Sequence, residues 1–71
     1  MRRNIDKISE RIVKILDESS EPLETKEIEE FLKGITRTKI LYRLNNLRGD
    51  GAIKGKNVGS GKGTWIWWKN E

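Results

Sequence analysis

The sequence predicts an α+β fold in which three helices precede a two-stranded β-hairpin, within a single domain spanning residues 1–71. Between residues 5 and 49, apolar side chains recur at helical spacing in three segments, each bounded by capping or turn residues. After residue 51 the pattern changes to β-branched and aromatic residues around a glycine-rich loop, which is typical of a hairpin.

The first helix is expected over roughly residues 5–18. Its inward positions follow a helical period and are Ile5, Ile8, Ile12, Ile15 and Leu16. Asn4 precedes the pattern and is a suitable N-cap residue. The segment from Ser19 to Pro22 is expected to end the helix, because proline cannot continue it.

The second and third helices are expected over residues 26–32 and 37–49. Thr25 is the expected cap of the second helix, and Gly34 follows it as a C-terminal glycine would. The inward residues of this helix are expected to be Ile28, Phe31 and Leu32. In the third helix, which Thr36 caps, the apolar stripe consists of Ile40, Leu44 and Leu47, with Leu41 at its edge.

The hairpin is expected over residues 52–69, with strands 52–58 and 64–69. The glycine-rich connection is no phosphate-binding P-loop, since Lys62 is followed by Gly63 and then by a strand pattern rather than a helix. Strand alternation places Trp65 and Trp67 on one face and Trp68 on the other. At least one tryptophan is therefore expected in the core and at least one is expected to be largely exposed. The sequence does not determine which residues of the two strands pair.

Composition excludes several classes of function. The chain has no cysteine and no histidine, which removes thiolate and imidazole metal sites, disulfides and the commonest general base. We therefore expect no enzyme activity, no cofactor, no metal and no small-molecule substrate. No apolar segment approaches the roughly 20 residues of a membrane span, so no membrane association is expected. These features favour an intracellular, cytoplasmic location, and the 37% of charged residues without any glutamine suits a thermophilic or archaeal source.

Charge is distributed unevenly along the chain. Residues 1–30 hold six basic and nine acidic residues, a balance of −3, whereas residues 31–71 hold nine basic and two acidic residues, a balance of +7. The net charge is +4. Such segregation predicts a basic surface on one side of the domain, as nucleic-acid-binding domains have.

The close succession of the second and third helices is typical of a helix-turn-helix, whose second helix enters the DNA major groove. With the basic hairpin that follows, the chain resembles the winged-helix family over nearly its whole length, and "GITRTKILYRLNNLRGDGAI" resembles the recognition helix and first wing strand. The resemblance implies binding of double-stranded DNA, as in a transcriptional regulator or a chromatin or replication accessory. The residues that it implies are Arg37, Thr38, Lys39, Tyr42, Arg43 and Asn46 on the helix, and Lys56, Ser60 and Lys62 on the wing.

Within that family, "KILYRLNNL" is similar to the third helix of Zα domains, which bind left-handed DNA through a tyrosine at the place of Tyr42. Trp65 or Trp67 would stand for their wing tryptophan. The chain departs from their pattern at Thr38, where they have asparagine, and in the wing, which lacks their pair of prolines.

The side-chain chemistry agrees with duplex binding without the family resemblance. Arg37 and Lys39 lie in the first turn of the third helix, where the dipole favours phosphate. Arg43 and Asn46 are side-chain types that contact guanine and adenine edges. The alternative is a domain for protein contacts within a replication or transcription assembly, with a protein partner or a second copy bound through an exposed tryptophan.

Overall fold

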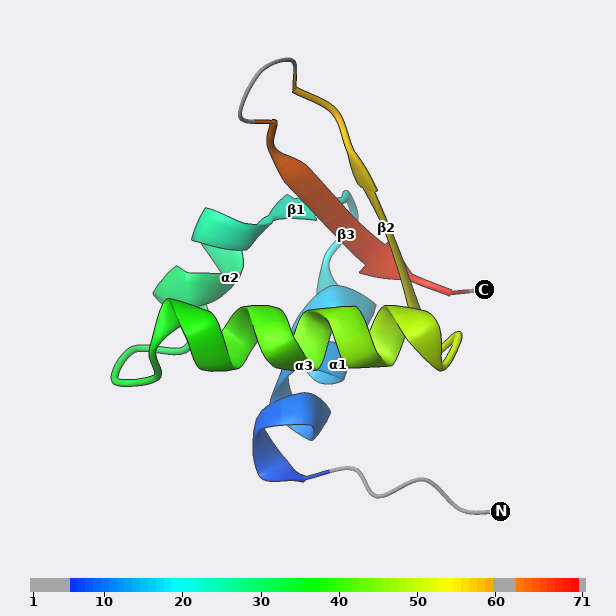
Figure 1. The fold of residues 1–71 in the computed structure, drawn as a ribbon. Helices are drawn as coiled ribbons and strands as arrows, with labels where there is room; N and C mark the ends of the chain where they lie inside the picture. The colour runs from blue at the N-terminus through cyan, green and yellow to red at the C-terminus, as the bar shows by residue number, and fades with distance from the viewer. Residues whose placement is uncertain (1–5, 60–62, 71) are drawn as a thin grey trace.

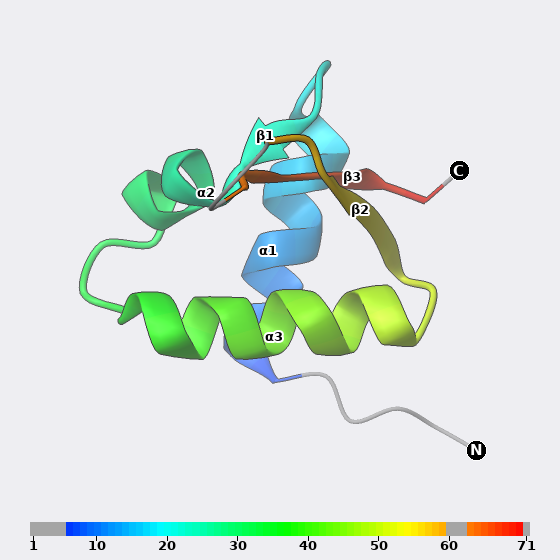
Figure 2. The same ribbon diagram turned by 45° about the horizontal axis from the view of Figure 1, so that its top comes forward.

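The computed structural model describes residues 6–59 and 63–70 and confirms a small α+β fold of three helices and an antiparallel sheet (Figure 1). In chain order the elements are α1 (Lys7–Glu18), β1 (Leu23–Glu24), α2 (Thr25–Phe31), α3 (Arg37–Gly49), β2 (Ile53–Asn57) and β3 (Trp65–Lys69). Both ribbon views show α3 crossing α1 steeply, and Figure 2 shows β3 passing across the C-terminal half of α1 (Figures 1 and 2).

Helix α1 begins later than residue 5, where the sequence predicted it. Asp6 is its N-cap, with extended backbone and a side-chain Oδ1 that accepts a hydrogen bond from the Ser9 amide at 2.9 Å. A carboxylate suits this position, because it accepts a hydrogen bond from a free amide of the first turn and its negative charge is favourable at the N-terminus of a helix. Asn4, the expected cap, and Ile5 lie outside the described residues.

Helix α2 also differs at both ends from the prediction. Glu24 is its N-cap, and the Glu24 amide donates to the Glu27 carboxylate at 2.7 Å, so Thr25 is free to turn inward as the first helical residue. At the other end the helix stops at Phe31, and Leu32 leaves the helical conformation and enters the core. The expectation that Phe31 points inward is wrong, because its side chain is 58% exposed.

Helix α3 has the predicted bounds and the predicted apolar stripe. Thr36 caps it by accepting a hydrogen bond from the Lys39 amide at 3.3 Å. Ile40, Leu44 and Leu47 are buried, as their spacing indicated. Gly34 and Gly51 flank the helix with φ values of +90° and +83°, a conformation that residues with a Cβ rarely adopt.

The sheet has three strands in the order β1-β3-β2, so the predicted two-stranded hairpin is incomplete. Strand β1 pairs Leu23 with Trp67 and Glu24 with Ile66, on the far edge of β3 from β2. The β2–β3 pairing sets Lys54 opposite Trp68 and Lys56 opposite Ile66. Strand β3 is therefore central, although it is the last of the described elements along the chain.

The core lies between the helices and the inner face of the sheet, and its largest residue is Trp67. Its members are Ile12, Leu16, Ile28, Leu32, Ile40, Leu44, Leu47, Ile53 and Trp67. The Trp67 indole Nε1 donates to Thr25 Oγ1 at 2.9 Å, which satisfies the one polar atom of the buried ring.

The expectation of a largely exposed tryptophan is wrong, because Trp65 and Trp68 are both partly buried. Trp65 stacks on Trp67 with ring centroids 5.3 Å apart, and the Arg48 guanidinium lies 5.1 Å from the centre of the Trp65 ring. Trp68 lies on the opposite face of the sheet, where it lines a groove together with Lys54 and the segment after α1. Alternation was predicted correctly, but these neighbours were not.

Candidate nucleic-acid interface

The surface of α3 that points away from the core carries four of the predicted contact residues. These residues, which we call the outer face, are Thr38, Lys39, Tyr42 and Asn46, and all four are exposed. At about 100° per residue they fall on the side of the helix opposite Ile40, Leu44 and Leu47. Tyr42 is 64% exposed, so it does not pack against α2 and its hydroxyl is available to a partner.

Arg43 lies at the edge of the outer face and is held in an ion pair. Its Nε and Nη2 donate to Asp6 Oδ2 at 3.0 and 2.6 Å, and only 23% of its side chain is exposed. Mainly through this hydrogen bond, and then through the Ser9 amide, the pKa of Asp6 falls to about 2. The Arg43 guanidinium also lies 5.8 Å from the centre of the Tyr42 ring. A phosphate or base that binds Arg43 has to compete with Asp6.

Arg37, in the first turn of α3, is also paired. Its Nη1 donates to Glu29 Oε2 on α2 at 2.6 Å, while its side chain remains largely exposed. The pair links α2 to the start of α3 across the turn between them. Since an exposed pair of this kind contributes little to stability, Arg37 can exchange Glu29 for a phosphate at small cost.

A groove of about 500 Å³ separates α3 from the start of β3. Its lining residues are Arg37, Leu41 and Asn45 on α3, Glu24, Thr25 and Lys26 at the start of α2, and, on the sheet side, the segment from Gly63 to Trp65 and Trp67. Arg48 continues the helical strip and covers Trp65. This strip, Arg37-Leu41-Asn45-Arg48, has helical spacing on the side that faces the hairpin.

Asn45 and Arg48 were missed as candidate site residues. The signal that could have identified them is their position on the same side of α3 as Arg37, combined with a hairpin that must fold back along the helix. The groove also brings Asn45, rather than Tyr42, to Trp65. Tyr42 is not among the residues that line this groove.

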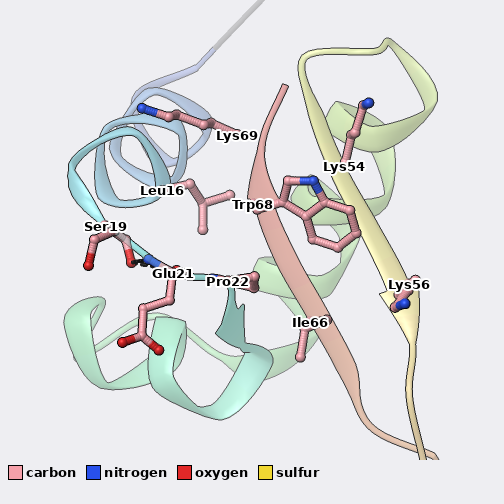
Figure 3. Close-up of a pocket in the computed structure, with 10 residues that line it drawn as sticks. Leu16, Ser19, Glu21, Pro22, Lys54, Lys56, Ile66, Trp68 and Lys69 are labelled. Carbon is pink, nitrogen blue, oxygen red and sulfur yellow. Dashed lines mark hydrogen bonds between the residues drawn. The ribbon is translucent and has the colours of Figure 1, made fainter. Parts of the chain in front are cut away.

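Lys56 does not join the residues on α3. It lies with Lys54 on the reverse face of the sheet, beside Ile66 and Trp68, as Figure 3 shows. The face is fixed by β2, where Ile53 points into the core and Gly55 lies against the Trp67 ring, so the alternate residues point outward. Lys54 is a second basic residue of this face and was not among the predicted contact residues. Ser60 and Lys62 lie outside the described residues.

Charge is segregated in space as well as along the chain. Helix α3 and strand β2 carry basic side chains at Arg37, Lys39, Arg43, Arg48, Lys54 and Lys56. Helix α2 and its cap carry Glu24, Glu27, Glu29 and Glu30 against the single Lys26. Basic side chains thus lie on α3 and, on a different surface, on the reverse face of the sheet, whereas α2 is mainly acidic.

Within residues 6–59 and 63–70, no group of acidic side chains is arranged to hold a metal ion, and no helix combines the length and apolar character of a membrane span. Comparison of the chain with protein-family models, with curated proteins and with solved structures gave no match.

Proposed function

We propose that this protein is a winged helix-turn-helix domain that binds double-stranded DNA, with α3 in the major groove and the β2–β3 hairpin as its wing. The observation that carries the proposal is the outer face of α3. It holds an exposed amide, a hydroxyl, a phenol and an ammonium group on a helix that projects no apolar side chain there. These groups are the donors and acceptors that read base edges and phosphates.

The dimensions of α3 support this use. A helix of 13 residues is about 20 Å long and about 10–12 Å wide with its side chains, which suits a major groove about 12 Å wide. In this arrangement Thr38, Tyr42 and Asn46 approach base edges. Lys39 and Arg37, in the first turn, approach the flanking phosphates, where the helix dipole adds to their charge.

The groove between α3 and β3 supports a second line of contact. Asn45 and Arg48 lie on the hairpin side of the helix, so they follow the strand of DNA that runs toward the wing. Arg48 is already held over Trp65, which limits the side-chain entropy lost when it meets a phosphate.

The proposal is tested by titrating random-sequence duplex DNA at two salt concentrations. Lys39→Ala should weaken binding to all sequences and reduce the slope of log K against log salt by roughly one unit. Lys14→Ala is the matched control, because it removes another exposed lysine, from the outer side of α1, and should leave affinity and slope unchanged. Equal effects of the two changes, or affinity independent of salt, would show that the outer face is not a DNA-binding surface.

A further inference from the structure

Asp6 stands at the start of α1, and both oxygens of its carboxylate are engaged. Oδ1 accepts a hydrogen bond from the Ser9 amide at 2.9 Å, which makes Asp6 the N-cap of the helix. Oδ2 accepts the two hydrogen bonds from Arg43 at 3.0 and 2.6 Å. The bond to Ser9 depends on the backbone of α1 and not on Arg43. The carboxylate is therefore expected to keep its place when Arg43 moves.

This carboxylate lies beside the outer face of α3. Arg43 follows Lys39 by four residues and precedes Asn46 by three, and side chains at these spacings are neighbours on a helix surface. Both ribbon views show the first turn of α1 close to the middle of α3, which Arg43 occupies (Figures 1 and 2). The Asp6 side chain is 48% exposed, and a pKa of about 2 keeps it ionised at neutral pH. A ligand on the outer face therefore meets a negative charge at this edge.

The two ion pairs of α3 differ in how easily a phosphate can displace them. Arg37 donates to Glu29 from Nη1, and its side chain is 59% exposed. Arg43 donates from both Nε and Nη2, and its side chain is far less exposed. Pairing through two N–H groups of the guanidinium is the stronger arrangement. A phosphate that reaches Arg43 has to break two hydrogen bonds, and it then lies close to a carboxylate that the Ser9 amide holds in place.

We propose that Asp6 acts as an internal competitor of DNA for Arg43 and thereby lowers the affinity of the outer face for duplexes of every sequence. Its carboxylate occupies N–H groups that a phosphate oxygen would use, and it repels the phosphate that approaches them. The inference rests on the proposed function, since it concerns the regulation of the same surface. Removing the Asp6 charge should strengthen DNA binding, which is opposite to the expected effect of removing the Lys39 charge.

Asp6→Asn is the variant that isolates this charge. Asparagine and aspartate are about equally good N-cap residues, so the variant should keep α1 and the circular dichroism spectrum of the folded domain. Its association constant for random-sequence duplex DNA should rise about two- to fivefold at low salt, a range that corresponds to the strength of an exposed ion pair. The slope of log K against log salt should steepen by at most about one unit, because Arg43 is then free to bind a phosphate.

Glu10→Gln is the matched control for the change in net charge. It removes another exposed carboxylate from the first turn of α1. The control should raise the association constant by less than about twofold, because salt screens charges that make no direct contact with the DNA. A gain in Asp6→Asn no larger than that in Glu10→Gln would overturn the inference. Weaker binding by Asp6→Asn than by the parent would overturn it too, since Asp6 would then hold Arg43 in its DNA-binding position.

Combining Asp6→Asn with Arg43→Gln tests whether the gain depends on the arginine. Without the guanidinium Asp6 has nothing to withhold from DNA. In the Arg43→Gln background the gain from Asp6→Asn should therefore fall to that of Glu10→Gln. Equal gains in the two backgrounds would contradict competition for Arg43.

The parent protein and Lys39→Ala separate this inference from the proposed function. Salt-dependent binding that Lys39→Ala weakens, without the expected gain in Asp6→Asn, would overturn only the competitor role of Asp6. Absence of salt-dependent binding in both the parent and Asp6→Asn would overturn the proposed function and the inference together.

Discussion

Gly55 offers the sharpest test of how the hairpin packs on the core. A Cβ built at this position would lie 2.7 Å from Cζ3 of Trp67, well inside the ordinary contact range of 3.4–4 Å. The ring has little room to retreat, since Trp65 stacks on it and its Nε1 is bonded to Thr25 at 2.9 Å. Gly55→Ala should therefore overpack the core and reduce the free energy of unfolding by about 1–3 kcal/mol.

That loss is large for a domain of this size, whose total stability is expected to be about 4–10 kcal/mol. It corresponds to a fall in the melting temperature of at least about 4 °C. The assay is urea and thermal unfolding followed by tryptophan fluorescence. Gly49→Ala is the control, because a methyl group there meets nothing within 4 Å and a helical alanine is favoured over glycine. The reasoning is refuted if Gly55→Ala unfolds no more easily than Gly49→Ala.

Three further predictions concern stability. Leu44→Ala should lower the free energy of unfolding, measured with urea, by about 2–5 kcal/mol, because the Leu44 side chain of α3 is fully buried in the core. Thr25→Val should cost about 1–3 kcal/mol in the same assay by leaving the Trp67 indole N–H without its partner, and an unchanged midpoint would show that the bond contributes nothing. Asp6, whose pKa falls from 3.8 to about 2, should contribute stability that is complete above about pH 4 and is lost as pH falls through about 2. Unfolding measured from pH 7 to pH 2 should lack this step in Asp6→Asn.

Much of the helical architecture could be predicted because it depends on local signals. The bounds of α3 follow from Thr36, from the stripe of three apolar residues and from the glycines after it, all of which act within a few residues. The errors arose where two local solutions compete. Asp6 rather than Asn4 caps α1, and α2 ends at Phe31 because Leu32 turns into the core. In both cases the sequence pattern fits the expected and the observed helix end about equally well, so tertiary contacts decide between them.

The long-range features could not be predicted from the pattern. Strand β1 has only two residues and exists because Leu23 and Glu24 pair with β3, more than 40 residues later. Arg43 is drawn from the outer face of α3 toward Asp6, 37 residues earlier. In the candidate site, helical periodicity identified the exposed residues of α3, but only the fold of the hairpin brings Asn45 and Arg48 into the groove and puts Lys56 on the opposite face of the sheet.

The central position of β3 also affects how the chain matures during synthesis. The ribosome releases α1, α2 and α3 before the strand that carries Trp67, so their apolar stripes remain uncovered until that strand has emerged. In the folded domain β1 and β2 both bond to β3 and not to each other, so the sheet forms only when β3 is present. The sheet therefore cannot form until residue 69 has left the ribosomal exit tunnel. Folding of this domain is completed only after nearly all the residues described above have been translated.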